Sequence, residues 1–113
     1  MTTTYTPTNI KLMRNTLAIN GFQSFVRIMK ERACCKLPEL TQLIVSETGF
    51  EFSEVRAWKK HGVDNRSAAL ALCELAEKYN VYFGLHMLIP TQEVCEAWLT
   101  WEQKHPDTVK HAA

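Results

Sequence analysis

The stretch from Phe52 to Lys60 carries the side chains best suited to chemistry in this sequence. Arg56 can donate two parallel hydrogen bonds to the edge of a guanine base, and Ser53 and Lys60 can bond bases or phosphates. Glu54 can accept a hydrogen bond from a cytosine amino group. An exposed helix with these residue types is usually only a solvated surface, so the interpretation depends on the elements around it.

Other reactive sites are not indicated by the sequence. It has no glycine-rich phosphate loop, no nucleophile elbow and no carboxylate pair spaced for acid–base chemistry. The four histidines and four cysteines lack the spacing of metal ligands, and Cys34 and Cys35 beside Lys36 have no placed histidine to activate a thiol. We therefore predict a protein that is not an enzyme, with no catalytic residue, no metal ion and no cofactor.

The composition is that of an ordinary soluble globular domain. The chain has 113 residues, of which 46% are hydrophobic and 22% are charged. No uncharged run approaches the roughly 18 to 20 apolar residues of a membrane span, and residues 1 to 10 are too polar for a secretory leader. From the length and composition we expect a single core, and from the lack of an apolar span we expect no membrane partner. The scattered cysteines fit buried or free thiols in a reducing compartment, so we also expect a cytoplasmic location.

Charge is distributed unevenly along the chain, although the formal net charge is only +1. Residues 1 to 36 hold six lysines and arginines against one acid, a balance of +5, whereas residues 90 to 113 hold four acids against two lysines, a balance of −2. The small net charge argues against nucleic-acid binding by bulk electrostatics alone. The uneven distribution either orients a partner or arises by chance.

A first helix is predicted before the "NG" pair at residues 20 and 21, because apolar residues recur there at helical spacing after polar cap candidates. These residues are Ile10, Met13 and Leu17, with Thr8 and Asn9 as caps. A second helix is predicted from Phe22 to Cys35, with one apolar stripe facing inward. The stripe consists of Phe22, Phe25, Val26 and Met29. Pro38 then suits the first turn of the next helix.

The middle of the chain predicts two short helices joined by a tight turn. The first runs from about Pro38 to Thr48, and Gly49 supplies the left-handed conformation just beyond its end. The second begins around Phe52 or Ser53, since apolar residues three positions apart mark its inner side. Helices joined this closely are expected to cross at a large angle.

Two more helices are predicted toward the carboxyl end. One is capped by Asp64 or Asn65 and runs to about Tyr79, and the other starts at Thr91. Residues 81 to 88 between them are rich in β-branched and aromatic side chains, which allows either a short β element or a buried connection. The predicted fold is therefore mainly α, a compact helical bundle in which residues 81 to 88 are the candidate β element.

Residues Leu40 to Val81 resemble the lambda-repressor/Cro-like (Xre-type) family of helix-turn-helix domains. The shared pattern is "IVSETGF", then Val55 and Trp58, a loop glycine, and "LALCELAEKYNV". Two residues depart from the family's pattern. Val45 stands where similar proteins usually have alanine, and Glu51 stands where a small capping residue is common.

The resemblance implies how such a domain would contact DNA. Residues 22 to 35 would be the family's first helix, residues 38 to 48 the positioning helix, and residues 52 to 60 the recognition helix in the major groove. It assigns groove-facing roles to Ser53, Glu54, Arg56, Ala57 and Lys60, and backbone contacts are expected from Gln42, Lys59, Asn65 and Arg66. The stretch from Leu37 to Phe52 opposes this role, since it carries three acids and no base, and neutralised phosphates normally contribute to affinity.

A helix-turn-helix monomer contacts few base pairs, so we expect a homodimer on double-stranded DNA. The expected interface is the apolar stripe of the last helix, formed by Val94, Trp98 and Trp101. Alternatively, these residues seal the core of one monomer, or residues 81 to 88 pair as an edge strand with a second copy. The predicted organisation is an N-terminal extension or helix (1–21), the helix-turn-helix domain (22–81), a C-terminal helical extension (82–104) and a flexible tail (105–113).

These expectations favour a transcriptional regulator, most simply a repressor of phage or mobile-element type that occupies an operator. The alternative is a protein-interaction module, antitoxin-like or inhibitory, that keeps the scaffold and binds another protein through its tryptophan face and acidic tail. The charge of the recognition face discriminates between them. A basic surface joining Arg56, Lys60 and Arg66 to the amino-terminal bases favours DNA, whereas an acidic patch formed by the glutamates between residues 39 and 54 favours a protein partner.

Overall fold

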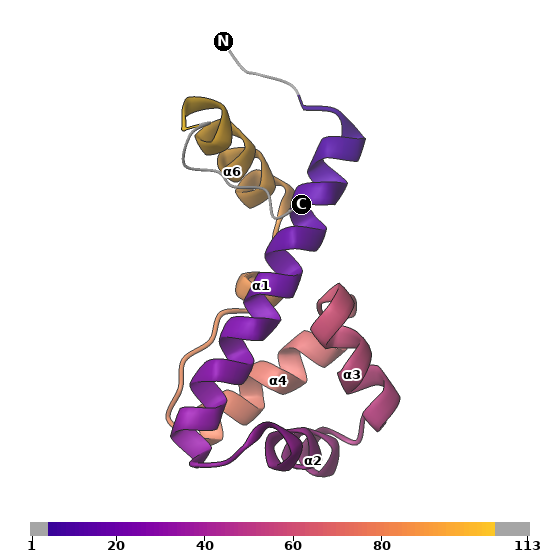
Figure 1. Ribbon diagram of the computed structural model, residues 1–113, viewed down its shortest axis with the longest axis vertical. Coiled ribbons are helices and arrows are strands. Elements are labelled where there is room, and N and C mark those ends of the chain that lie inside the picture. Colours follow the sequence, from indigo (N-terminus) through magenta and orange to yellow (C-terminus); the bar gives the residue numbers. More distant parts are fainter. Residues whose placement is uncertain (1–4, 106–113) are drawn as a thin grey trace.

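Figure 1 shows the computed structural model, whose described residues run from 5 to 105. They form the helices α1 (Pro7–Ala33), α2 (Leu37–Thr48), α3 (Phe52–His61), α4 (Arg66–Lys78), α5 (Leu85–Leu88) and α6 (Gln92–Lys104). Helices α2, α3 and α4 gather at the C-terminal half of α1, whereas α6 lies along its N-terminal half (Figure 1). The molecule is therefore elongated, with extents of 47 × 26 × 26 Å. The prediction of a mainly helical fold is confirmed.

Helix α1 starts earlier than the sequence pattern predicted. Thr6 is its N-cap, because the Thr6 Oγ1 accepts a hydrogen bond from the Asn9 backbone N–H at 3.2 Å. Pro7 occupies the first helical position, where a missing N–H is harmless. The helix ends where Cys34 adopts the left-handed conformation, with φ of 52°. The prediction of Thr8 or Asn9 as the cap is therefore wrong.

The prediction that this first helix ends at residues 20 and 21 is also wrong, because α1 continues through them. Gly21 is helical and lies against α5, where an added Cβ atom would come 1.8 Å from the Met87 carbonyl oxygen. Glycine is needed at this position because two backbones meet there, and not because the chain turns. As a consequence, the expected boundary between residues 21 and 22 falls inside a continuous helix.

The main core forms where the C-terminal half of α1 meets α2, α3 and α4. Of the predicted stripe, Phe22, Phe25 and Met29 are fully buried there, whereas Val26 is partly buried. Trp58 of α3 meets Phe22 and Phe50 edge-on, with ring centroids 5.9 and 5.4 Å apart. Edge-to-face pairs of this kind contribute about 0.5–1.5 kcal/mol each beyond the burial of area. This aromatic cluster therefore anchors α3 to α1.

Helices α2 and α3 lie close to their predicted bounds. Gly49 ends α2 with a φ of 79°, and its N–H donates to the Val45 carbonyl at 2.9 Å. A side chain would be strained in that left-handed conformation, which explains the glycine. The chain then needs only Phe50 and Glu51 before α3 begins. The shortness of this turn fixes α3 beside α2.

Helix α4 also confirms its prediction. Asn65 is the N-cap, and its Oδ1 accepts from the Ser67 backbone N–H at 2.8 Å. The inward face of α4 is buried, with Ala69, Leu72, Leu75 and Ala76 in the core. Helix α4 thus closes the core from the side opposite the α1 stripe.

The β element allowed for residues 81 to 88 does not form. Val81 and Phe83 are buried while Tyr82 is exposed, which is the alternation typical of a strand. A strand also needs a partner, and residues 5 to 105 contain no other strand to pair with this stretch. The chain instead passes along the core as a partly buried connection and enters the short helix α5.

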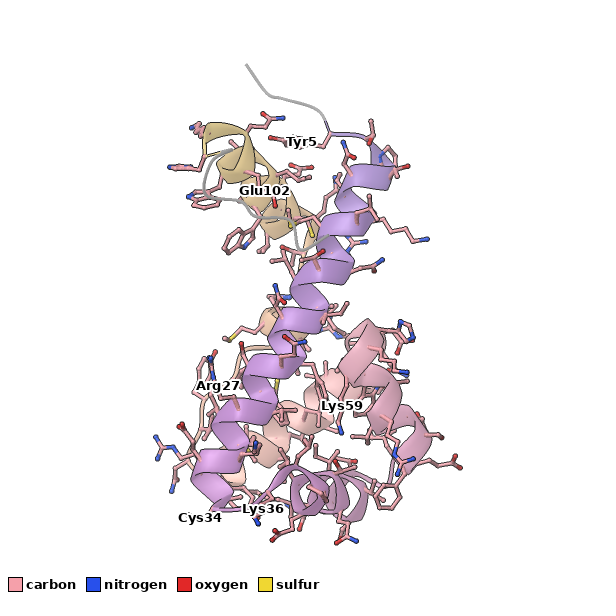
Figure 2. The ribbon with its side chains drawn as sticks, in the orientation of Figure 1. Tyr5, Arg27, Cys34, Lys36, Lys59 and Glu102 are labelled. Carbon is pink, nitrogen blue, oxygen red and sulfur yellow. The ribbon has the colours of Figure 1, made fainter. Side chains whose placement is uncertain are left out.

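Helix α6 packs through one side onto the N-terminal half of α1. Thr91, where the helix was predicted to start, is its N-cap, and the Thr91 Oγ1 accepts a hydrogen bond from the Val94 N–H at 3.2 Å. Cys95 is the residue of α6 that is fully buried. The Tyr5 hydroxyl and the Thr100 Oγ1 are hydrogen-bonded at 2.6 Å, and Figure 2 shows Tyr5 between the start of α1 and α6. Few buried side chains hold this end together.

Candidate nucleic-acid interface

Helix α3 presents its predicted contact residues to solvent. Val55 and Trp58 anchor its inner side, with only 1% and 4% of their surfaces exposed. Successive residues are about 100° apart around a helix, so Ser53, Arg56 and Lys60 form one row on the outer side. The exposed residues of this side are Ser53, Arg56, Ala57 and Lys60. A partner can therefore reach this row without any movement of the core.

A shallow groove between the start of α2 and the side of α3 brings three of the predicted contact residues together. Its volume is about 340 Å³, and Gln42, Arg56 and Lys59 line it beside the apolar Pro38 and Phe52. Lys59 is half-buried, and Figure 2 shows it on the side of α3 that faces α1. This α2–α3 groove offers one amide and two cations. These groups can donate hydrogen bonds to phosphate oxygens and to acceptors on base edges.

Glu54 has a structural role that the sequence prediction missed. The Glu51 backbone N–H donates to the Glu54 Oε1 at 3.4 Å, which closes the first turn of α3. Residue 54 lies about 200° from residue 56 around the helix, so its carboxylate is on the other edge from Arg56. A carboxylate at the start of a helix is also favoured by the helix dipole. Glu54 therefore serves α3 itself, and its contact with a cytosine stays a prediction.

Of the two loop residues expected to contact the DNA backbone, Asn65 has a structural role and Arg66 is exposed. Asn65 uses its Oδ1 to cap α4, so its amide NH₂ group is the donor that remains for a phosphate. Arg66 is exposed as the first residue of α4. Both residues follow the end of α3, and their contact with DNA stays a prediction.

The acidic residues of α2 and α3 do not enter the α2–α3 groove. Its lining includes no carboxylate. The Glu47 Oε2 lies 2.8 Å from the Lys78 Nζ, and this ion pair joins α2 to α4. The hydrogen bond to Glu47 is also the main cause that raises the pKa of Lys78 above its ordinary value. The groove therefore keeps the positive character that Arg56 and Lys59 give it.

The four cysteines are free thiols. Burial is the main cause that raises the pKa of Cys35, Cys73 and Cys95 above the ordinary value of a thiol. A thiol with a raised pKa stays protonated at neutral pH and is a weak nucleophile. Within residues 5 to 105, no group of His, Cys, Asp and Glu side chains is arranged to hold a metal ion. His111 lies outside the described residues.

The predicted interface residues of α6 lie on its outer side. Val94, Trp98 and Trp101 are 36%, 46% and 40% exposed, so they do not seal the core of the monomer. The two indole rings meet edge-on, with centroids 5.9 Å apart. A groove of about 630 Å³ begins beside Val94 and Trp98 and extends to α1 and Met87. The face is therefore open to a partner.

Two exposed residues beside this face were missed by the sequence prediction. Tyr82 is 88% exposed and Met87 is half exposed, and both line the larger groove. The available sign was the apolar character of residues 81 to 88, which describes a core segment equally well. Only the packing of α5 against α1 shows which side chains of this segment are left outside.

Comparison with known proteins identifies no relative of this chain. No family model matches it, and no curated protein or solved structure gives a significant match. None of the described helices is both long and apolar enough to cross a membrane. The lambda-repressor/Cro-like resemblance thus depends on the residues that carry it.

Proposed function

We propose that this protein is a sequence-specific transcriptional regulator of the lambda-repressor/Cro type, which binds operator DNA as a homodimer. The main support for this proposal is the position of α3. The short turn after Gly49 holds α3 beside α2, while the row of Ser53, Arg56 and Lys60 stays exposed. A recognition helix needs this combination, because its inner side must be fixed while its outer side enters the major groove.

In this proposal α3 lies in the major groove and the α2–α3 groove faces a phosphate strand. Arg56 donates two hydrogen bonds to a guanine, and Ser53 and Lys60 contact neighbouring bases or phosphates. Gln42 and Lys59 bind backbone oxygens at the edge of α3. The outer row of α3 would therefore recognise bases, and the residues of the α2–α3 groove would position the protein on the DNA backbone.

The local charge distribution supports this assignment. Lys36 is the exposed N-cap of α2 and directly precedes Leu37, which lines the groove with Arg56 and Lys59. Glu47 is paired with a lysine of α4, and Glu54 bonds the start of α3, so two acids are engaged away from Arg56. With a formal net charge of only +1, affinity for DNA must come from such local contacts.

Repression by occupancy is the simplest mechanism for a protein of this kind. A dimer that holds an operator excludes other proteins from the overlapping promoter, and no catalytic step is needed. This mechanism fits a small regulator of phage or mobile-element type.

Selection of duplexes from a random pool tests the proposal. The purified full chain is expected to enrich a palindromic site, whose half-sites reflect the two-fold symmetry of the dimer. Binding to that site is expected to weaken as the salt concentration rises, because phosphate contacts release counterions. A folded protein that enriches no site would overturn the proposal and favour a protein-interaction module on the same scaffold.

A further inference from the structure

The outer side of α6 carries four exposed apolar residues that can pack against a second copy of themselves. They are Val94, Ala97, Trp98 and Trp101. Their spacing is symmetric about the point midway between residues 97 and 98. An antiparallel second copy of α6 therefore places Trp101 opposite Val94 and Trp98 opposite Ala97. Each indole then meets a smaller side chain, which is the complementarity that close packing requires.

We infer that this face binds a second copy of the same chain, with the two α6 helices antiparallel about a two-fold axis near Ala97 and Trp98. In such an interface residue i contacts residue j and j contacts i, as this symmetric spacing allows. The inference rests on the homodimer of the proposed function, and it gives that dimer a surface and an orientation. It does not depend on whether α3 binds DNA.

The hollows around α6 fit this occupant. One of about 420 Å³ is lined by Ala97, Trp98 and Trp101. The larger groove of about 630 Å³ shares Trp98 with it and continues past Val94 to Met87. Because antiparallel pairing brings the partner's Trp101 over Val94, that indole enters the larger groove. The same contact covers Met87, which the monomer leaves half exposed.

The charges beside the apolar face agree with the antiparallel orientation. Glu93 and Lys104 are both exposed and lie on the same edge of the face, about 20° apart around the helix axis. Like edges face each other in an antiparallel helix pair. Glu93 of each copy therefore lies within about 3 Å along the helix axis, two residues, of the level of Lys104 of the other copy, twice by symmetry. Charge pairs at the rim of an interface fix orientation and partner choice more than they raise affinity.

The tryptophan rings are held in place before a partner arrives. Trp98 meets Trp101 edge-on, and Trp101 stacks on His105 with ring centroids 4.5 Å apart. Side chains that are already ordered lose little entropy on binding.

The exposed area shows how far the contact must extend. The exposed parts of Trp98 and Trp101, 46% and 40%, amount to roughly 100 Å² each. A stable interface buries about 800 Å² per partner, so the contact must extend from α6 into the larger groove.

Sedimentation equilibrium of the full chain without DNA tests the inference. The wild-type chain is expected to dimerise, and Trp98→Ala and Trp101→Ala are each expected to weaken the dimer roughly a hundredfold, because both copies lose the contact. Leu70→Ala is the matched control, since Leu70 is 43% exposed on α4 and is expected to leave the dimer unchanged. Far-UV circular dichroism confirms that each variant keeps its helices. A monomeric wild type, or tryptophan variants that dimerise normally, would overturn the inference.

A charge exchange tests the orientation. Lys104→Glu places like charges near each other twice and is expected to weaken the dimer roughly three- to tenfold. The double variant Glu93→Lys with Lys104→Glu restores the pairing and is expected to regain most of that loss. A double variant no stronger than the single one would exclude the antiparallel arrangement. Because these measurements contain no DNA, their failure leaves recognition by α3 standing, and failure of duplex selection leaves the dimer standing.

Discussion

The tryptophans that lie beside the two halves of α1 differ in their surroundings. Trp58, at the C-terminal end, is 4% exposed and lies among aromatic rings, whereas Trp98 and Trp101, beside the N-terminal end, are 46% and 40% exposed. The difference follows from the number of neighbours, since α2, α3 and α4 gather at one end and α6 alone covers the other (Figure 1). A large apolar side chain becomes core only where enough elements surround it. At the N-terminal end, we propose that a second copy supplies the missing layer.

Replacing one tryptophan from each end gives the largest expected contrast. Trp58→Ala empties the space between Phe22 and Phe50 and is expected to lower the free energy of unfolding by about 3–5 kcal/mol. Trp98→Ala removes a side chain that is largely in solvent and is expected to cost about 1 kcal/mol or less at concentrations where the chain is monomeric. Urea denaturation followed by circular dichroism measures both. Equal losses would mean that both ends are parts of one core.

The junction between the ends depends on Gly21. Gly21→Ala drives a Cβ into the Met87 carbonyl and is expected to lower the free energy of unfolding by about 1–3 kcal/mol. Gly84→Ala is the control, because Gly84 has φ of −74° and its added Cβ would lie 3.8 Å from the nearest atom. Its stability is expected to stay unchanged or rise by up to about 1 kcal/mol in the same denaturation measurement. A neutral Gly21→Ala would contradict the close approach of α1 and α5.

Removing a helix cap at each end of the molecule is expected to show the same difference between the two ends, with a smaller loss of stability. Asn65→Ala removes the exposed N-cap of α4, a helix that packs in the main core, and is expected to lower the global free energy of unfolding by about 1 kcal/mol. Thr91→Ala removes the equivalent cap of α6, where few buried contacts couple the helix to the core. Native-state hydrogen exchange should therefore show faster exchange in α6 with little change in α4. If Thr91→Ala speeds exchange in both helices equally, the ends are not separable.

Local chemistry explains which parts of the fold could be predicted. Gly49, Asn65 and Thr91 mark helix ends through bonds to residues a few positions away, and each prediction is confirmed. Gly21 belongs to the "NG" pair, which is equally typical of a helix end. The reason for a glycine there is instead the close approach of the Met87 backbone, which lies in a distant part of the sequence. The sequence left a β element and a buried connection open for residues 81 to 88 for a related reason, because a strand depends on a partner that the local pattern does not contain.

The candidate site divides along the same line. The outer row around Arg56 follows from helical periodicity once Val55 and Trp58 define the inner side of α3. The capping bond of Glu54 and the groove shared by Gln42 and Lys59 depend on side-chain geometry that spacing cannot supply. The apolar stripe of α6 repeats like a core stripe, so the sequence left two alternatives, an exposed interface or a sealed core. The exposed fractions of Val94, Trp98 and Trp101 exclude the sealed core.

The most direct test of recognition by α3 compares wild type and Arg56→Ala on the selected duplex and on a shuffled duplex, by fluorescence anisotropy at one salt concentration. Arg56 is exposed, so the variant is expected to keep its fold and its dimer. We predict that Arg56→Ala loses about 1–3 kcal/mol of the discrimination between the two duplexes, while the control Leu70→Ala binds like wild type. Unchanged discrimination in Arg56→Ala would contradict recognition of DNA by α3.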